Sequence, residues 1–235
     1  KKKFPNKIIT SNENDIFLEK RINLVSIASY DNHHYRHILK CIKYNKNIIV
    51  EKQMCLNLNQ LKKINNLLKQ KKKIKITSNL VLRVNSLFKK FKEKIKNKKI
   101  YYIEADYLWG RKNKLFGWRS NVRDYSLILG AGIHMIDLFR FFSNQEFECI
   151  SSHVSTEYWD IENEDNAFLL LKSKKGTIAS LHSTANQWRH KFLLEMTFEE
   201  GYLNLDGILS ETRSYAPETL IIGQREFEDV TFAMG

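Results

Sequence analysis

The sequence contains little proline, glycine and cysteine. Among its 235 residues are 2 prolines, 9 glycines and 3 cysteines, so the residues that usually mark turns and domain boundaries are sparse. The cysteines, Cys41, Cys55 and Cys149, form no CxxC pair and are odd in number. This pattern argues against a disulfide framework and against a zinc knuckle, and it fits a protein of a reducing compartment.

Long apolar runs are also missing. No stretch approaches the roughly 18 consecutive apolar residues of a membrane-spanning helix, and the start, KKKFPNKIIT, lacks the apolar part of a signal peptide. The sequence contains no nucleophile elbow, P-loop or HExxH motif. We therefore expect a cytoplasmic protein that does not insert into a membrane.

What the sequence does contain is positive charge. Apolar residues make up 43% of the chain, which is ordinary for a globular protein, but 39 Lys and Arg against 26 Asp and Glu leave a formal charge of +13. Such a charge raises nucleic acid as a partner. In the Lys-rich segment 89–99, however, apolar residues recur at helical spacing beneath the lysines, which indicates a solvated helix face, and no nucleic-acid-binding signature occurs. A nucleic-acid partner is therefore not the expected one, although it stays open as an alternative.

The first 78 residues alternate short apolar runs with helical patterns. Ile22, Leu24, Val25 and Ile27 form a nearly continuous apolar run, typical of a parallel strand that is buried on both faces. Because consecutive parallel strands need crossover helices, this part predicts half of a doubly wound sheet. The expected strands are Lys7–Thr10, Ile22–Ser29, Asn47–Val50 and Ile74–Ser78, and the expected helices are Asn32–Tyr44, which places Ile38, Cys41 and Ile42 on one face, and Leu56–Leu68.

After Ser78 the pattern changes to strand-like stretches with little helix between them. Two helices are expected at Ser86–Lys96 and Gly132–Phe142, and the stretches that follow carry alternating, β-branched and aromatic residues. The predicted fold is therefore α/β with two domains. Residues 1–78 form the C-terminal half of a Rossmann-like domain, and residues 79–235 form an α+β domain with a mostly antiparallel open sheet. The expected strands of the second domain are Ala167–Leu171, Thr177–Thr184, Phe192–Phe198 and Tyr202–Leu205.

Several motifs follow one another in an order typical of one enzyme family. The segment INLVSIASYDNHHYRHILKCIKYNKNIIVEKQM resembles the second half of the nucleotide-binding domain of the glucose-fructose oxidoreductase/inositol dehydrogenase (Gfo/Idh/MocA) family. Downstream, LFGWRSNVRDYSLILGAGIHMIDLFRFF is similar to its Trp-Arg motif, Gly-rich loop and His-x-x-Asp helix, and GTIASLHSTANQWRHKFLLEMTFEEGYLNLDG resembles its sheet domain. The resemblance implies an oxidoreductase that uses NAD or NADP. Such an enzyme transfers a hydride between the nicotinamide and a hydroxyl-bearing carbon of a sugar or sugar nucleotide.

Lys52 is the first candidate catalytic residue. It lies just past the carboxyl end of a predicted parallel strand, at the edge where open α/β sheets bind their ligands. A partly desolvated lysine there can have its pKa lowered into the working range and exchange a proton with a hydroxyl. The residues alone also allow a plain surface lysine; the match of Glu51-Lys52-Gln53 to the family's Glu-Lys-Pro motif favours the catalytic role.

His134 is the second candidate catalytic residue. His134 and Asp137 lie three residues apart on a predicted helix, and Gly130 and Gly132 allow close backbone approach at its start. Histidine titrates near neutral pH and suits acid/base work. From spacing alone, His134 could be a hydrogen-bonded structural residue and Asp137 a partner of Arg140. The resemblance favours catalysis for His134 and leaves Asp137 open between substrate binding and structural support.

The remaining candidate residues surround these two. The resemblance implies that Ala28, Ser29, Tyr30, His34, Glu51 and Lys52 contact the cofactor. Asn79, Arg83, Trp118 and Arg119 are candidate substrate contacts, because arginine binds phosphate or carboxylate and tryptophan stacks on a sugar or base, although each could equally be structural. His33 and His37 have a spacing that a metal could use, but no further ligand completes a set, so we expect no metal.

The sequence also departs from the family pattern. Gly130 stands where many members carry an acid/base aspartate, and the Gly-x-Gly-x-x-Gly phosphate loop, expected before Lys7, is not in the sequence. We therefore expect an incomplete piece, or a naturally decayed copy, of a longer enzyme. The expected partners are a sugar-type substrate and further copies of the chain, bound through the C-terminal sheet. The alternatives are a non-catalytic sugar-binding or scaffolding member and a nucleic-acid binder.

Overall fold

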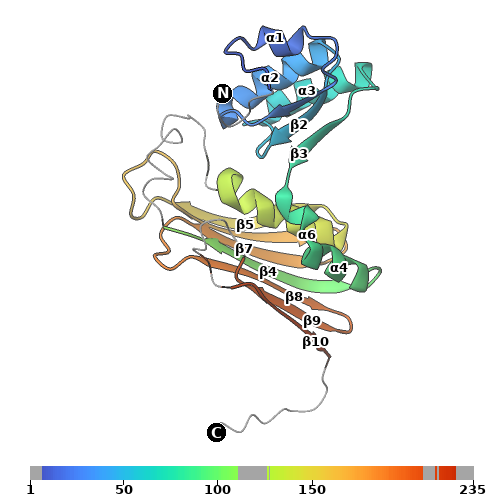
Figure 1. Cartoon of the computed structure of the whole chain (residues 1–235). Coiled ribbons are helices and arrows are strands. Elements are labelled where there is room, and N and C mark those ends of the chain that lie inside the picture. Colours follow the sequence, from blue (N-terminus) through green and yellow to red (C-terminus); the bar gives the residue numbers. More distant parts are fainter. Residues whose placement is uncertain (1–6, 111–125, 127, 209–214, 216, 226–235) are drawn as a thin grey trace. The chain divides into compact units, whose positions relative to one another are not determined.

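The computed structural model of the chain describes residues 7–110, 126, 128–208, 215 and 217–225 (Figure 1). The chain folds as two compact units, Lys1–Asn79 (unit 1) and Leu80–Gly235 (unit 2). No helix among the described residues is both long and apolar enough to cross a membrane.

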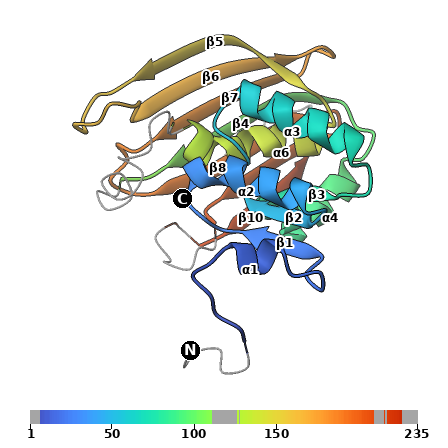
Figure 2. The same cartoon turned by 90° about the horizontal axis from the view of Figure 1, so that it is seen from above.

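Unit 1 contains a parallel three-stranded sheet in the order β1-β2-β3. The helices α2 and α3 connect the strands in turn and contact each other, as Figure 2 shows. Asn57 caps the start of α3 by accepting the backbone N–H of Gln60. The elements are α1 (Asn14–Phe17), β1 (Leu24–Ile27), α2 (Asp31–Lys43), β2 (Asn47–Glu51), α3 (Leu58–Gln70) and β3 (Ile76–Asn79).

The core of unit 1 lies between α2, α3 and the sheet. The three apolar residues expected on one face of α2 are all buried there, together with Ile64 of α3 and residues of β2. Two sequence predictions are wrong. Lys7–Thr10 forms no strand, and the side chain of Ile8 is 91% exposed. The strand expected at Ile22–Ser29 is shorter, and Leu24 is exposed, because β1 has a strand neighbour on one side only within the described chain.

Unit 2 is built on a seven-stranded sheet in the order β10-β9-β8-β4-β7-β6-β5. Within this sheet β4 and β7 pair in parallel, and the other pairs are antiparallel. The expected α/β fold class is therefore confirmed. The elements are η1 (Val81–Val84), α4 (Ser86–Lys94), β4 (Ile100–Leu108), the π-helical turn η3 (Ile128–Gly132), α6 (Ile133–Ser143), β5 (Phe147–Ser155), β6 (Asn166–Ser173), β7 (Ile178–Thr184), β8 (Lys191–Phe198), β9 (Gly201–Asp206) and β10 (Thr219–Gln224).

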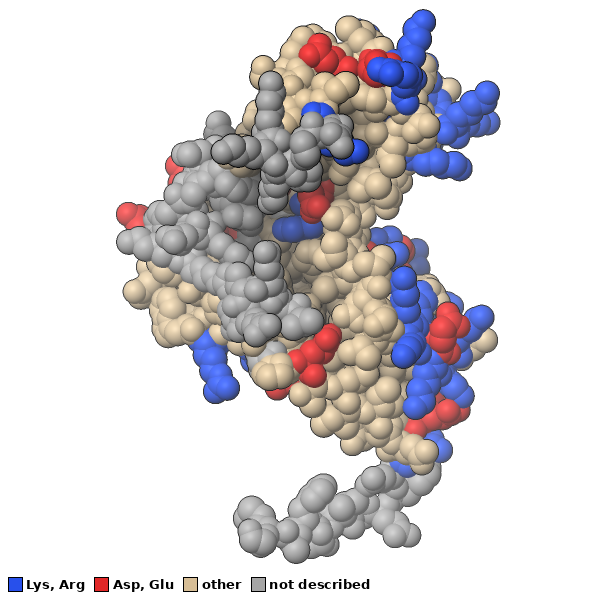
Figure 3. Space-filling model, in the orientation of Figure 1, with Lys and Arg blue, Asp and Glu red and all other residues tan. Residues whose placement is uncertain are grey.

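The two longer helices of unit 2, α4 and α6, cover one face of this sheet (Figure 1). Phe88 and Phe91 of α4 and Phe139 of α6 are buried against alternating residues of the strands. Lys89, Lys90 and Lys94 of α4 are exposed, as expected for a solvated helix face, whereas Lys92 bonds to the carbonyl of Phe141. Figure 3 shows Lys and Arg side chains gathered over this part of unit 2.

The sequence missed three strands, β4, β5 and β10. The omission of β4 matters most, because β4 lies in the middle of the sheet and pairs with β7 and β8. Its sequence carries Glu104 and Asp106, which interrupt the apolar pattern. Asp106 is accommodated there because it accepts a hydrogen bond from Lys191 at 2.6 Å, on the face of the sheet that the helices do not cover.

Candidate functional site

In unit 1 the three parallel strands end at the same edge of the sheet. Ala28, Ser29 and Tyr30 follow β1, Lys52 follows β2, and β3 ends at Asn79. The register pairs Ile27 with Val50 and Glu51 with Asn79, so these ends are level with one another. Topology therefore brings the predicted cofactor residues to one edge. Their roles toward a cofactor stay predictions.

His34 connects two of the strand ends. Its ring is fully buried, with Nδ1 2.7 Å from the carbonyl oxygen of Gln53 and Nε2 2.9 Å from the carbonyl oxygen of Ser29. Both contacts are to main-chain acceptors, so the imidazole holds the segment after β1 to the segment after β2. His34 was expected to contact the cofactor. In unit 1 its ring nitrogens instead contact the backbone of Ser29 and of Gln53. These lie in the segments after β1 and β2, which contain other residues predicted to contact the cofactor.

A second histidine connects this edge to the segment before β1. Ser29 Oγ lies 3.0 Å from Nδ1 of His37, and the Nε2 of His37 lies 3.2 Å from a carboxylate oxygen of Glu13. Burial lowers the pKa of His37, and the neighbouring positive charge of Arg36 lowers it further. Sequence reasoning did not find this chain of contacts, because Glu13 lies in an irregular segment far from its histidine partner in sequence. The i, i+4 spacing of His33 and His37 was the only available signal.

Glu51, Lys52 and Asn79 complete the edge. Asn79 donates from Nδ2 to the carboxylate of Glu51 at 2.6 Å, so a predicted substrate contact and a predicted cofactor contact bind each other. The side chain of Lys52 is half-buried. The peptide bond between Lys52 and Gln53 is cis.

The chemistry of this edge fits the nicotinamide end of a dinucleotide. Ala28 and Tyr30 are exposed, Ser29 and Lys52 are half-buried, and the amide oxygen of Gln53 is buried without a hydrogen-bond partner among the described residues. A buried acceptor of this kind favours a ligand with an N–H donor. For the pyrophosphate, the sequence provides no Gly-x-Gly-x-x-Gly loop.

In unit 2, His134 lies in the first turn of α6. A π-helical turn precedes the helix, and a Cβ atom added to Gly132 would come within 3.2 Å of the Leu181 side chain, so glycine allows the helix start to approach β7 closely. The half-buried imidazole of His134 meets the ring of Tyr107 edge to face, with 6.5 Å between the ring centroids. Tyr107, at the carboxyl end of β4, was not a predicted site residue, because the strand itself was not predicted.

Asp137 contacts a different arginine from the one considered in the sequence. It is almost fully buried and accepts two hydrogen bonds of 2.6 Å from the guanidinium of Arg83. Arg140 instead pairs with Glu146. Two candidate substrate contacts, Arg83 and Asp137, thus form a bidentate ion pair that joins η1 to α6, which corrects the pairing of Asp137 with Arg140. The remaining two, Trp118 and Arg119, lie outside the described residues.

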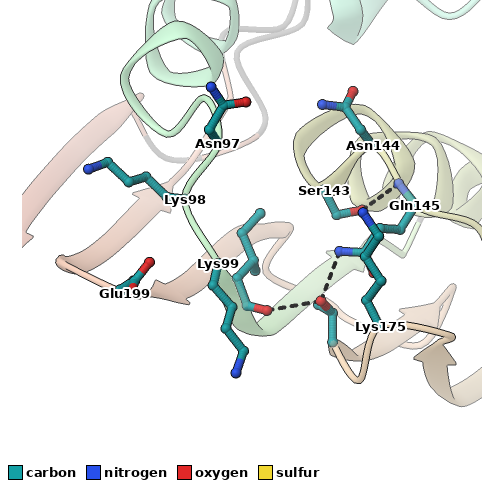
Figure 4. A pocket seen from close by; sticks show the side chains of 10 residues that line it. Asn97, Lys98, Lys99, Ser143, Asn144, Gln145, Lys175 and Glu199 are labelled. Carbon is teal, nitrogen blue, oxygen red and sulfur yellow. Dashed lines mark hydrogen bonds between the residues drawn. The ribbon is translucent and has the colours of Figure 1, made fainter.

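A cavity of about 340 Å³ lies near the C-terminal end of α6, whereas His134 lies at its start. Figure 4 shows its lining, in which Lys98, Lys99 and Lys175 point in different directions and Gln145 bonds to Thr177 at 3.1 Å. The amine of Lys98 forms an ion pair with Glu200. None of the predicted site residues that the structure describes lines this cavity.

The parallel crossover sheet of unit 1 has the arrangement of dinucleotide-binding domains, and the helix-covered, mostly antiparallel sheet of unit 2 follows it in the chain. Comparison with protein families agrees. Residues 3–79 match the model described as "Oxidoreductase family, NAD-binding Rossmann fold", and residues 88–204 match the "GFO/IDH/MocA C-terminal domain". The chain belongs to the Gfo/Idh/MocA family of oxidoreductases, and its first unit is part of an NAD-binding domain.

Solved structures share this fold at low sequence identity. A putative oxidoreductase from Erwinia carotovora atroseptica has a TM-score of 0.80 at 17% identity, over 96% of this chain and 72% of its own. Scyllo-inositol dehydrogenase from Lactobacillus casei, solved with bound NAD(H) and scyllo-inositol, has a TM-score of 0.72 at 16% identity, over 90% of this chain and 66% of its own.

UDP-N-acetylglucosamine 3-dehydrogenase from Acidithiobacillus ferrooxidans has a TM-score of 0.71 at 14% identity, over 92% of this chain and 69% of its own. The chain thus spans about two thirds of the length of these structures. No curated protein sequence matches it.

Proposed function

We propose that this chain belongs to an enzyme that transfers a hydride between NAD or NADP and a hydroxyl-bearing carbon of a sugar or sugar nucleotide. The observation that carries the proposal is the position of Lys52, which is half-buried at the carboxyl edge of the parallel sheet, directly after β2. This strand lies within residues 3–79, which match an NAD-binding family model. A bound nicotinamide supplies the hydride acceptor or donor.

The protein's part of the reaction is proton transfer. The proposed acid/base candidates are the amine of Lys52 in unit 1 and the imidazole of His134 in unit 2, since each group can accept and release a hydroxyl proton. Gly130 provides no carboxylate for this role. Ser29 and Tyr30 line the edge, and the ring of His34 keeps the segments after β1 and β2 in place.

Two of the structural neighbours support the proposed substrate class. One was solved with a cyclic polyol and another is named for a nucleotide-linked sugar, and both have this fold. The formal charge of +13, from 39 basic against 26 acidic residues, favours a phosphorylated or nucleotide-linked sugar for this chain.

Substitution of the two proposed acid/base residues tests the function. The natural gene product that contains this chain is assayed for NADH or NADPH formation with scyllo-inositol, myo-inositol and UDP-N-acetylglucosamine. Lys52→Met and His134→Asn should each lower kcat by about 10²- to 10⁴-fold. The matched controls are Lys72→Met and His153→Asn, which change an exposed lysine and an exposed histidine elsewhere.

The same assay distinguishes the alternatives. Unchanged rates in both variants, or binding of a sugar without turnover in the unmodified protein, would favour a non-catalytic sugar-binding member instead. Turnover confined to uncharged polyols would remove the preference for a charged sugar.

We further propose that copies of the chain associate through the face of the seven-stranded sheet that the helices leave uncovered. The register places Phe168, Leu170 and Tyr202 on this face, and all three are exposed. Phe168 and Leu170 are neighbours on β6, and Tyr202 lies on β9 further along the same face. Exposed apolar side chains on one face are typical of interfaces. Sedimentation analysis of Phe168→Glu should show a smaller species than the unmodified protein, and an unchanged mass would contradict the proposal.

The proposed compartment is the cytoplasm. None of the three cysteines forms a disulfide, and Cys41 is buried as a free thiol. Free thiols are usual in reducing compartments.

A further inference from the structure

Two large aromatic side chains of unit 2 are exposed and touch each other. Tyr158, in the turn between β5 and β6, is 64% exposed, and Trp188, in the turn between β7 and β8, is 61% exposed. Their ring centroids are 4.8 Å apart, with an interplanar angle of 72°. Tyrosine and tryptophan are enriched among the residues that carry most of the binding energy of protein interfaces. The exposed pair is therefore a candidate interaction surface.

The two turns that carry these rings are held together. The carboxylate of Asp165 is fully buried and accepts the backbone N–H groups of Tyr158 and Trp159, each at 2.9 Å. The indole of Trp159 packs edge to face against both exposed rings, with centroid distances of 5.0 Å to Tyr158 and 5.9 Å to Trp188. Its Nε1 donates to the carbonyl oxygen of Ala185 at 2.9 Å. Because the rings are held in place before a partner binds, little conformational freedom is lost on binding.

Carboxylates surround the exposed rings. Residues 157–165 contain five acidic residues and no lysine or arginine, in a chain whose formal charge is +13. Two of the five are engaged, Asp165 as described above and Glu164 by accepting the backbone N–H of Ile128 at 3.2 Å. Arg189 in the neighbouring turn adds one exposed positive charge, so the surroundings of the rings stay negative. The three remaining carboxylates are exposed and belong to Glu157, Asp160 and Glu162.

This combination of groups fits the cationic side chains of a protein segment. The faces of tyrosine and tryptophan rings attract an ammonium or guanidinium group that lies within about 6 Å of the ring centroid. Carboxylates beside the rings add charge-assisted hydrogen bonds to the same groups. The three rings contact one another directly, so the cations would lie on the outer faces of Tyr158 and Trp188. A basic segment therefore fits this surface better than an apolar or an acidic one.

A segment of matching charge occurs in the chain itself. Residues 62–75, in α3 and the turn that follows it, contain seven lysines and no acidic residue. All seven lysines are exposed. Lys71 donates to the side chain of Asn45 at 2.9 Å, and the other six form no ion pair within the part of the chain that the structure describes. This uncompensated positive charge favours contact with a negative surface.

We propose that the acidic aromatic surface, formed by residues 157–165 and Trp188, binds the lysine segment, residues 62–75, of a second copy of the chain. The ammonium groups of the lysine segment lie over the exposed ring faces and pair with the exposed carboxylates. This contact joins a surface of unit 2 to a different surface of unit 1, so it is heterologous and separate from the sheet-face association proposed above. It does not depend on the proposed function.

Paired charge reversals test the contact in the full chain. All variants also carry Phe168→Glu, which removes the proposed sheet-face association, and sedimentation over a range of concentrations measures the remaining association. The average mass of the Phe168→Glu chain should rise with concentration. Asp160→Lys with Glu162→Lys, and separately Lys72→Glu with Lys73→Glu, should each lower the association constant at least about tenfold, because each pair places like charges opposite each other.

Matched controls separate this contact from an effect of net charge. Glu93→Lys with Glu199→Lys, and Lys89→Glu with Lys90→Glu, make the same changes in charge at exposed positions outside both surfaces. They should change the association constant far less than the test pairs. Equal effects of test and control pairs would show a dependence on net charge alone and would overturn the proposal.

Mixing the two test variants verifies that they are folded and that their surfaces match. Each variant then offers a surface of opposite charge to the other, so an equimolar mixture should associate again. Trp188→Ala should weaken association about fivefold through loss of the ring face, whereas Tyr101→Ala, at a ring that is 44% exposed outside both surfaces, should leave it unchanged. A mixture that stays dissociated, or a mass of the Phe168→Glu chain that does not vary with concentration, would contradict the proposed contact.

Discussion

Unit 1 and unit 2 bury their apolar residues in different ways. In unit 1 three short strands and two helices enclose a small core, and the edge strand β1 leaves Leu24 half exposed. In unit 2 the central strands of a seven-stranded sheet lie beneath two helices, and residues such as Ile103, Phe139 and Leu194 are fully buried. The predicted cofactor-binding edge therefore lies in a unit with a small core, where specific polar contacts hold the strand ends in place. The acid/base candidate His134 lies in a unit with a large apolar core.

A substitution that creates a cavity in the larger core, that of unit 2, should have the largest effect on stability. Phe139→Ala should destabilise unit 2 by about 3–5 kcal/mol, because the ring projects from α6 and is fully buried in the core of the unit. Denaturant unfolding, followed by NMR signals from each unit, measures the effect. Tyr101→Ala, at an aromatic residue that is 44% exposed, is the control and should cost far less. Equal losses in both variants would contradict the proposed difference between core and surface.

Asp165 forms a polar brace in unit 2, that is, a buried carboxylate that holds a turn by hydrogen bonds. Its removal should lower the stability of the unit somewhat less than the loss of Phe139. Asp165 is fully buried and accepts the backbone N–H groups of Tyr158 and Trp159, each at 2.9 Å. Asp165→Ala leaves these donors unpaired and should cost about 3 kcal/mol. Glu162→Ala, an exposed carboxylate in the same turn, is the matched control.

The brace also predicts an acid response. Burial alone would raise the pKa of Asp165, but the N–H donors, that of Trp159 foremost, outweigh it and lower the pKa below its ordinary value. A depressed pKa stabilises the fold above the ordinary aspartate pKa of about 3.9, and this stabilisation is lost as the pH falls through the native value. The Tm difference between the unmodified chain and Asp165→Asn should therefore shrink below about pH 4. A constant difference would contradict this assignment.

In unit 1 the corresponding brace is His34. His34→Leu removes two contacts to main-chain carbonyls and should lower the stability of unit 1 by about 2 kcal/mol, with little effect on unit 2. Hydrogen exchange of the amides after β1 and β2 should rise in the same variant. His33→Leu, one residue earlier and exposed, is the control. If exchange rises equally in both variants, His34 is not the connecting residue.

The smallest expected difference is chemical and leaves the folded state intact. Burial raises the pKa of Cys41, in the core of unit 1, to about 11, so its thiol should react with a maleimide only during opening of the unit. Cys149, exposed on the edge strand β5 of unit 2, should react at once. Mass spectrometry of timed samples measures both rates. Rapid labelling of Cys41 would show that the core of unit 1 opens readily.

Much of the fold could be predicted from local pattern. The alternation of apolar runs and helical faces predicts the crossover order of unit 1, and the helical spacing of Phe88, Phe91 and Ile95 predicts the buried side of the lysine-rich segment. Both signals depend only on neighbouring residues. The strand β4 was missed because Glu104 and Asp106 interrupt its apolar pattern, and Asp106 is accommodated by Lys191 on another strand, β8.

The candidate site was predictable where a motif marked it and unpredictable where contacts crossed the chain. Lys52 and His134 lie in recognisable motifs, although their roles stay predictions. The pairing of Asp137 with Arg83 spans 54 residues, and nothing in the sequence favoured it over the nearby Arg140. The rings of Tyr107 and His134 likewise meet only when β4 and the start of α6 come together.

By itself, the sequence determined the fold class through its order of apolar and polar residues, which reflects short-range periodicity. It also pointed to the family and to the candidate residues for acid/base chemistry, through a resemblance carried by motifs that are continuous in sequence. Only the tertiary structure decided which side chains are engaged with the protein itself. Ion pairs, main-chain contacts of buried histidines and ring clusters depend on distances between segments, and such distances are set by strand order and register rather than by any local pattern.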